Sequence, residues 1–205
     1  MKSLMYLASI LVLSLMTQMA VSQAFCSLRD PYHAMQTIFP EATHHRSIVK
    51  KIDHNIREKV ASILPAHTLH YGELGKHTLY IIYNDASPVG LIHVRSEASK
   101  WGLVEVAWAL NINQEILDFS IQRCRCSNKD DVTNDKVKAF FKHKTATQLI
   151  KILKHNDQLA PEVLVNAANG EKELATVILR SATKTLIVTD EGWKEDIDAL
   201  ISAGI

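Results

Sequence analysis

The stretch HTLYIIYNDASPVGLIHVRSEASKWGLVEVAWALNINQEILDFSIQRCRC (residues 77–126) decides the fold of this chain. It contains strand-like runs at residues 79–83, 89–94 and 101–110, which are rich in β-branched and aromatic residues. The turns between these runs are only a few residues long, whereas a parallel crossover needs a dozen or more. The runs therefore predict an antiparallel β-meander.

A two-residue period gives the later runs one apolar face each. Successive side chains on a strand point to opposite faces, so alternating residues share a face. The apolar positions of this pattern are Val104, Val106, Trp108, Leu110, Leu117, Phe119 and Ile121. Trp108 is accordingly predicted to be a core residue.

Helical patterns flank the meander on both sides. Before it, Asp30 as N-cap and Pro31 at the first helical position open one helix, and an apolar stripe predicts a second over residues 48–64. A short polar strand is expected between His67 and Gly75. After the meander, helices are predicted near residues 137–141, 145–153, 160–170, 171–187 and 193–201. The predicted fold class is α+β, an antiparallel β-meander sheet with N-terminal helices and a C-terminal helical cluster.

Residues 1–24 have the pattern of a secretory signal peptide. Lys2 supplies a positive start, Leu4 to Met16 is a nearly unbroken apolar run, and small residues precede a cleavage site after Ala24. An N-terminal membrane anchor is the alternative, because the apolar stretch approaches the roughly 20 residues that a span needs. We therefore expect an extracytoplasmic protein, periplasmic in a bacterial cell, with residues 25–205 as a single domain.

The balance of charge excludes one class of partner. The chain has a formal net charge of +1, and removal of Lys2 with the signal peptide makes the mature protein neutral. Nucleic-acid binding needs a basic surface, so no nucleic-acid partner is predicted.

Three cysteines remain after residue 24, at positions 26, 124 and 126. On an extended strand Cys124 and Cys126 would have Cα atoms roughly 7 Å apart, which is long for a disulfide. We therefore expect Cys26 to pair with one of them and to tie the N-terminus to the last strand. The remaining thiol would be buried or reactive. Redox catalysis by the Cys-x-Cys motif is the alternative to a structural role.

The string Arg180-Ser181-Ala182-Thr183-Lys184-Thr185 places hydroxyl groups between two cations. On a helical wheel Arg180, Thr183 and Lys184 collect on the side opposite an apolar stripe. Arginine and lysine side chains donate to phosphate oxygens, so this face suits a phosphate. An ordinary solvated helix face is the alternative interpretation.

The order of these elements and the string around Thr183 resemble the FMN-binding domain family. Its members include the flavin-carrying periplasmic subunits of Rnf-type and Nqr-type ion-pumping complexes. In that family a Ser/Thr-Gly-Ala-Thr motif carries FMN through a phosphoester on its last Thr, and the resemblance assigns this role to Thr183. Arg180 and Ser181 stand where the family has Ser or Thr and then Gly. Pro88-Val89-Gly90 matches a Val/Ile-Gly step of the family, and the resemblance covers most of residues 30–187.

The resemblance implies an FMN cofactor with further contacts on the meander. The cofactor-binding set is then Thr183, Arg180, Lys184, Ser181, Trp101, Gln122 and Arg123. The flavin ring needs an aromatic bed, for which Trp101 is the candidate, and donors for its carbonyls, for which Gln122, Arg123 and Arg125 are candidates. A solvated rim of the sheet is the alternative interpretation of the two arginines.

The remaining patterns indicate neither a metal site nor a catalytic site. His93, Arg95 and Glu97 share one face of a predicted strand, which favours pairing of Glu97 with an arginine across the sheet. The ten histidines of the chain show no metal-ligand spacing, so no metal site is predicted. The chain contains neither Gly-x-Ser-x-Gly nor a Gly-rich phosphate loop, and no catalytic residues are predicted.

Two functions follow from these expectations. The first is an electron carrier in envelope redox processes, with FMN on Thr183, a flavin-attaching enzyme, and a membrane or periplasmic redox complex as partner. The second is a flavin-free binding or assembly module on the same scaffold in the bacterial envelope. The departure from the family motif at Ser181 favours the second function. A yellow purified protein would favour the first.

Overall fold

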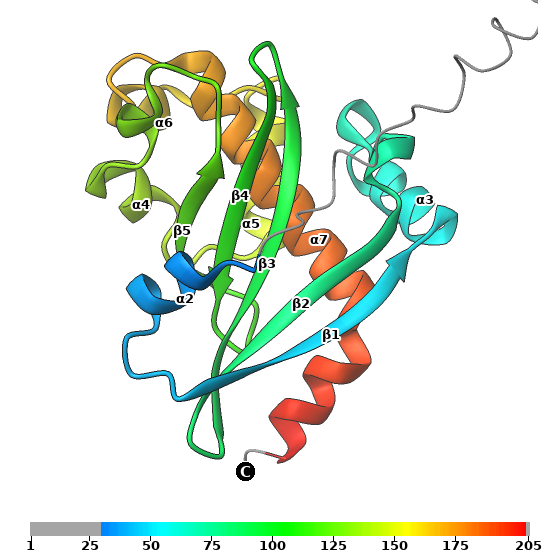
Figure 1. The fold of residues 1–205 in the computed structure, drawn as a ribbon. Coiled ribbons are helices and arrows are strands. Elements are labelled where there is room, and N and C mark those ends of the chain that lie inside the picture. The colour runs from blue at the N-terminus through cyan, green and yellow to red at the C-terminus, as the bar shows by residue number, and fades with distance from the viewer. Residues whose placement is uncertain (1–29, 204–205) are drawn as a thin grey trace, which may run out of the picture.

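Five strands form one antiparallel sheet at the centre of the protein. The computed structural model describes residues 30–203, so the predicted signal peptide and Cys26 lie outside the described residues. Each strand pairs antiparallel with the next. In order across the sheet (Figure 1) they are β1 (His44–Ile52), β2 (Gly75–Asn84), β3 (Ser87–Ser99), β4 (Gly102–Leu110) and β5 (Ile116–Arg123). The predicted α+β fold with an antiparallel meander is confirmed.

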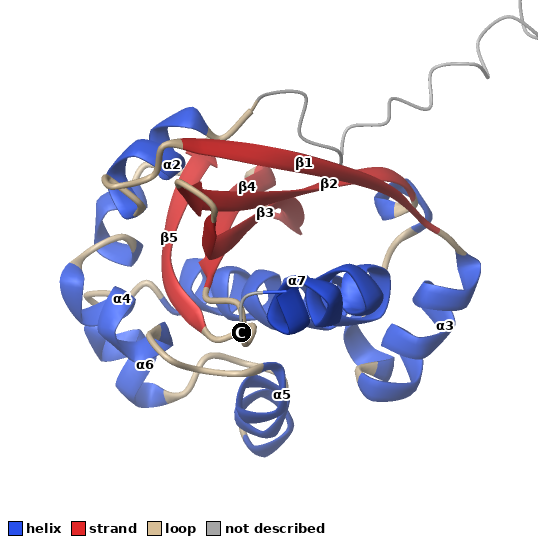
Figure 2. Ribbon diagram, turned by 90° about the horizontal axis from the view of Figure 1, so that it is seen from below, coloured by secondary structure: helices blue, strands red, loops and turns tan. Residues whose placement is uncertain are grey.

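One long helix, α7 (Lys172–Ala203), lies across a face of this sheet and contacts β1, β3 and β4. Figure 2 shows the sheet curving over α7, with helices on its other sides. The helices that contact it there are α3 (His54–Ile63), α5 (Ala146–His155) and α6 (Glu162–Ala167). Further elements are α2 (Tyr32–Ile38), α4 (Asp135–Phe141), η1 (Pro65–His67), η2 (Tyr71–Glu73) and η3 (Lys129–Val132). Helices α4, α5 and α6 confirm those predicted after the meander.

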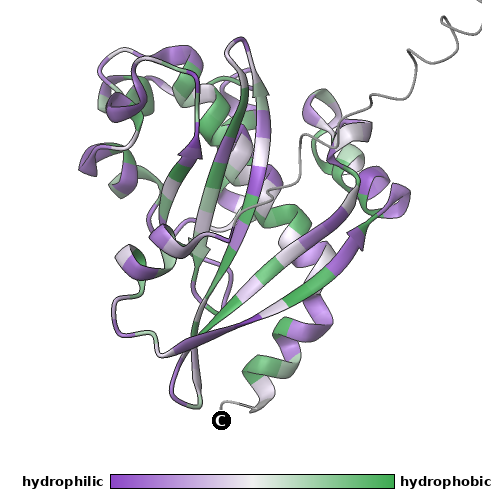
Figure 3. Cartoon of the chain, viewed as in Figure 1, coloured by the Kyte–Doolittle hydropathy of each residue, from purple (hydrophilic) through white to green (hydrophobic). Residues whose placement is uncertain are grey.

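The two faces of the sheet are packed differently. The face toward α7 holds the main core, in which Trp108 is fully buried as predicted. The opposite face holds a smaller core, where Met35 of α2 meets Ile92. Gly90 lies against the ring of Phe39, since a Cβ at Gly90 would stand 2.4 Å from it. Only glycine therefore lets the end of α2 approach the sheet so closely. Figure 3 shows hydrophobic residues in the middle of β2, whereas β1 is hydrophilic toward both ends.

The helix predicted over residues 48–64 is wrong in its first part. Residues up to Ile52 belong to β1, which pairs with β2 along its whole length. Helix α3 begins only after Asp53, whose carboxylate accepts from the amides of Asn55 and Ile56 at 3.0 and 3.2 Å. The local apolar stripe fits a helix, but β-branched residues in this segment gain ladder hydrogen bonds with a strand that follows much later in the chain.

Two smaller expectations are also corrected. Asp30 is not the N-cap of α2: Pro31 occupies that position, and the Asp30 carboxylate accepts from the Tyr80 hydroxyl at 2.6 Å. The segment expected as a polar strand forms the 3-10 turns η1 and η2 instead. The last two predicted helices are confirmed as the two parts of α7, which meet at a kink where the backbone is non-helical at Trp193 (φ −127°, ψ 16°). Gly192, directly before it, is the kind of residue at which helices kink.

Candidate functional site

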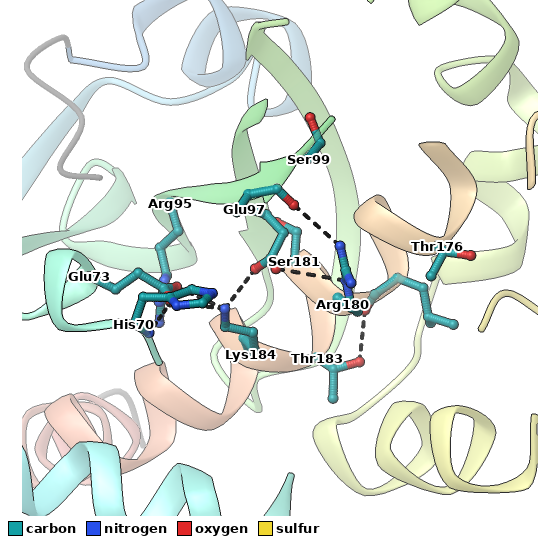
Figure 4. A network of polar contacts seen from close by, with 12 residues as sticks. His70, Glu73, Arg95, Glu97, Ser99, Thr176, Arg180, Ser181, Thr183 and Lys184 are labelled. Atoms are coloured by element: carbon teal, nitrogen blue, oxygen red, sulfur yellow. Dashed lines mark hydrogen bonds and ion pairs between the residues drawn. The ribbon is translucent and has the colours of Figure 1, made fainter. Parts of the chain in front are cut away.

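Five charged side chains meet where α7 passes the end of β3 (Figure 4). They are Glu73, Arg95, Glu97, Arg180 and Lys184, and we call them the charged cluster. Arg95 and Glu97 share a strand face because they are two residues apart, and Arg180 and Lys184 share a helix face because they are four apart. Arg180 is 22% exposed, whereas each of the other four is 7% exposed or less. Such burial makes every charge dependent on its neighbours.

Glu73 sits between two cations. Its Oε1 lies 2.9 Å from both Arg95 Nη2 and Lys184 Nζ. Its Oε2 accepts from the His70 amide at 2.7 Å and from Lys184 Nζ at 3.0 Å. Burial alone would raise the pKa of Glu73, but the charges of Arg95 and Lys184 and the His70 amide outweigh it, so the pKa is lowered. Glu73 is therefore ionised and fixes both cations.

Glu97 holds the opposite end of the cluster. Its Oε2 lies 2.9 Å from Lys184 Nζ and its Oε1 lies 3.7 Å from Arg180 Nε. The arginine partner of Glu97 thus comes from α7, and the predicted pairing across the sheet is wrong. Within residues 30–203, Arg180 Nε and Arg95 Nη1 are buried without a hydrogen-bond partner. The cluster holds three cations against two carboxylates and keeps two guanidinium donors unsatisfied.

A polar cleft of about 300 Å³ opens beside the cluster. It is lined by residues 66–71 together with Arg57, Glu97, Ala98, Arg180 and Lys184. Tyr71 is 70% exposed, and the Arg57 guanidinium lies 4.6 Å from the centre of its ring. Arg57 Nε also donates to the Leu69 carbonyl at 2.9 Å. The cleft therefore combines held cations with an exposed aromatic ring.

His67 lines the cleft and responds to the charges around it. Burial lowers the pKa of His67, and the positive charges of Arg180 and Lys184 lower it further. Its Nε2 is buried and has no hydrogen-bond partner in the described part of the chain. His67 is therefore neutral at pH 7 and keeps a buried ring nitrogen without a hydrogen bond beside the cleft.

Two more histidines are buried next to the cluster. His77 Nε2 lies 2.8 Å from the Glu73 carbonyl, and its ring stands edge-to-face against that of His93 at 5.9 Å. Burial, with Arg95, lowers the pKa of His77 to about 4. Burial, His77 and Arg95 hold the pKa of His93 well below its ordinary value. Both rings are neutral near pH 7, since a proton would add charge beside an already positive cluster.

Of the residues predicted around the family motif, Arg180 and Lys184 line the cleft, but Ser181 and Thr183 do not. Thr183 is fully buried, and its Oγ1 donates to the carbonyl one turn earlier in α7 at 2.8 Å. Ser181 Oγ accepts from Trp108 Nε1 at 3.0 Å. The expected exposed face is wrong because the sheet and the surrounding helices enclose α7. A phosphoester at Thr183 would require its hydroxyl to leave a fully buried position.

The other predicted cofactor contacts lie elsewhere on the sheet. Trp101 is half-buried in the turn between β3 and β4, and Gln122 and Arg123 end β5. Arg123 is 56% exposed and lies 3.7 Å from Glu105. None of these three residues lines the cleft. The structure thus brings together only two members of the predicted cofactor-binding set at this place.

Sequence reasoning missed the part of the site that precedes β2. Arg57, His67, Tyr71 and Glu73 come from α3 and from two 3-10 turns, which have no periodic pattern. Glu73 and Lys184 are 111 positions apart. No local spacing reports a contact across such a separation, so the sequence held no signal for this half of the site.

The cysteines pair differently from the prediction. Cys124 and Cys126 form a disulfide with each other. Strand β5 ends at Arg123, so the segment that follows is not extended, and the two Cα atoms approach to 5.2 Å. Both sulfur atoms are used in this bridge, and the predicted bridge to Cys26 is wrong.

Within residues 30–203, no group of three or more His, Cys, Asp or Glu side chains is arranged to hold a metal ion. In the same part of the chain, no helix has the length and apolar character needed to cross a membrane. Known protein families, curated proteins and solved structures include no match to this chain. The geometry and charge of the site therefore carry the functional argument.

Proposed function

We propose that this protein is an extracytoplasmic binding protein that holds a small anion, a carboxylate or a phosphate, in the cleft beside the charged cluster. The observation that carries the proposal is the charge imbalance of the cluster. Three cations face two carboxylates, and the Nε atom of Arg180, a residue that lines the cleft, is buried without a hydrogen-bond partner in the described residues. A buried donor without an acceptor is costly, and an anion from solution would bring both an acceptor and the missing negative charge.

The cleft offers the contacts that an anion needs. Arg180 is preorganised, because its Nη2 donates to the Ala98 carbonyl at 3.2 Å. A guanidinium held in this way loses little further conformational freedom on binding an oxyanion. An anion beside His67 would also raise the pKa of that ring by attraction. We therefore expect binding to tighten as the pH falls from 7 to 6.

A second candidate keeps FMN as the ligand and electron transport as the function. Its support is that Arg180 and Lys184, which suit a phosphate, line the same cleft as the exposed ring of Tyr71, which suits an aromatic stacking partner. In this arrangement FMN is bound without a covalent bond. Electron exchange with a membrane or periplasmic redox complex would then be the activity.

Isothermal titration of the mature protein with inorganic phosphate, succinate, FMN and riboflavin separates these cases. Binding of phosphate or succinate, weakened about tenfold or more by Arg180→Gln, supports the anion-binding function. The matched control is Lys100→Gln, which removes an exposed cation outside the cleft. Binding of FMN but not of riboflavin supports the second candidate. Absence of binding by all four probes, or equal affinity in Arg180→Gln, overturns the anion site.

Covalent FMN is tested separately by co-expression with a flavin-attaching enzyme. A fluorescent protein band after denaturation that Thr183→Ala abolishes would establish attachment at that hydroxyl. It would also require a conformation in which Thr183 is exposed. A dark band with unchanged mass in both proteins removes the covalent cofactor.

A further inference from the structure

The disulfide loop, residues 124–126, lies directly after the last strand of the sheet. Cys124 and Cys126 both pack on the edge of the main core and remain partly exposed. Arg123 and Arg125 flank the sulfurs in sequence, and both are exposed. Both residues of the bridge are thus partly exposed, and positively charged side chains flank them in the sequence.

A structural role explains this bridge poorly. A disulfide stabilises a fold mainly by restricting the unfolded chain, and the effect grows with the length of the closed loop. Cys124 and Cys126 are only two positions apart. The bridge therefore closes one of the shortest loops available and connects no two elements of the fold.

The surroundings of the two sulfur atoms are not equivalent. The backbone amide of Cys126 points at Cys124 Sγ at 3.1 Å. A hydrogen-bond donor and nearby positive charges favour a thiolate over a thiol. When the bridge opens, Cys124 is therefore the sulfur better placed to carry the negative charge, and Cys126 is the sulfur better placed to be attacked.

We propose that the Cys124–Cys126 disulfide is a thiol–disulfide exchange site that oxidises pairs of cysteines in client polypeptides. A client thiolate attacks Cys126 Sγ, the bond between the two sulfurs breaks, and its electron pair leaves on Cys124 Sγ. The second client thiolate then attacks the client sulfur of the mixed disulfide and releases Cys126 as a thiolate.

The electrons and protons of this exchange balance. The client loses two electrons and gains a disulfide, and the loop gains the two electrons as a dithiol after proton uptake from water. A low-molecular-weight disulfide such as glutathione disulfide restores the loop by the reverse chemistry. This activity is independent of the anion cleft, since neither cysteine lines it.

The test uses the mature protein with reduced, denatured ribonuclease A and glutathione disulfide. We expect a several-fold faster return of ribonuclease activity than with glutathione disulfide alone. Cys124→Ser and Cys126→Ser should each remove this acceleration, whereas Cys26→Ser should retain it. Acceleration that persists in the Cys124→Ser/Cys126→Ser double variant, or no acceleration by the wild type, overturns the proposal.

A second measurement tests the roles given to the two sulfurs. The reduced protein is treated at pH 6 with limiting iodoacetamide, and the modified peptides are mapped by mass. Faster modification of Cys124 than of Cys126, and slower modification of Cys124 in Arg125→Gln, are expected. Preferential modification of Cys126, or two free thiols in the protein as purified without reductant, contradicts the mechanism.

Discussion

The charged cluster and the disulfide loop place arginines in opposite environments. Arg95 in the cluster is 3% exposed and lies 2.9 Å from Glu73, whereas Arg123 beside the loop is 56% exposed and lies 3.7 Å from Glu105. Buried ion pairs depend strongly on each partner, while exposed pairs are screened by water and contribute little. Burial thus makes the first arginine part of the architecture, whereas the second is in contact with water and only weakly held by Glu105.

The largest expected effect comes from removing a carboxylate of the cluster. Glu73→Gln leaves Arg95 and Lys184 buried with too few partners, and we expect a loss of about 3–5 kcal/mol in the free energy of unfolding. Urea unfolding measures it. The matched control is Glu173→Gln, which removes an exposed pair with Lys100 and should cost at most about 1 kcal/mol. Equal losses would mean that burial does not separate the two kinds of ion pair.

The next effect is a loss of stability in acid. The pKa of His77 is about 4 in the folded protein against an ordinary value of 6.5. The unfolded chain therefore binds this proton first, and stability falls as the pH drops from 6.5 toward 4. The loss is about 3 kcal/mol for His77, and His93 adds to it in the same direction.

Urea unfolding at pH 7, 6 and 5 measures this dependence. His77→Gln should flatten it, whereas the exposed control His33→Gln should leave it unchanged. An unaltered slope in His77→Gln would assign the acid sensitivity to other groups.

A smaller effect distinguishes two hydroxyl groups on the same turn of α7. Ser181→Ala leaves the buried Trp108 Nε1 without its acceptor, so we expect a loss of about 1–3 kcal/mol. Thr183→Val removes a hydroxyl that bonds only within its own helix and should cost less than about 1 kcal/mol. Thermal unfolding of both variants checks the order. The reverse order would give Thr183 a role that its contacts do not explain.

A small effect is also expected at the disulfide loop. The double variant Cys124→Ser/Cys126→Ser should lose no more than about 1–2 kcal/mol, because the closed loop is so short. Urea unfolding against a Cys26→Ser control measures it. A much larger loss would show that the bridge stabilises the fold and would bring the loop closer in character to the charged cluster.

Prediction from sequence succeeded where the relevant pattern is local. The alternation around Trp108 identifies β4 and its buried face, and the apolar stripe of α7 is buried as expected. It failed at residues 48–52, where pairing with β2 prevails over a helical pattern. The prediction of an exposed hydroxyl at Thr183 was also wrong, because a helical wheel identifies the polar side of a helix but not the elements that cover that side.

In the candidate site, too, the features that depend on local sequence were predicted and those that depend on distant contacts were not. Arg180 and Lys184 were recognisable as a pair of cations four positions apart, which is a property of one helix. Their carboxylate partners come from η2 and β3, and the aromatic ring of the cleft comes from a turn without periodicity. The pairing of Cys124 with Cys126 depended on the residue at which β5 ends, and the ends of strands are the part of a fold that sequence patterns predict least accurately.

The sequence by itself determined the meander, the order of the helices and the positions of the cations, because these depend on periodicity and residue type within short segments. Only the tertiary structure decided that the polar side of α7 is buried, that Glu73 and Glu97 share Lys184, and that a cleft opens beside them. The physical reason is that burial and charge pairing depend on which distant segments meet in space. A charge that looks solvated in the sequence becomes part of a buried network once the sheet closes over it.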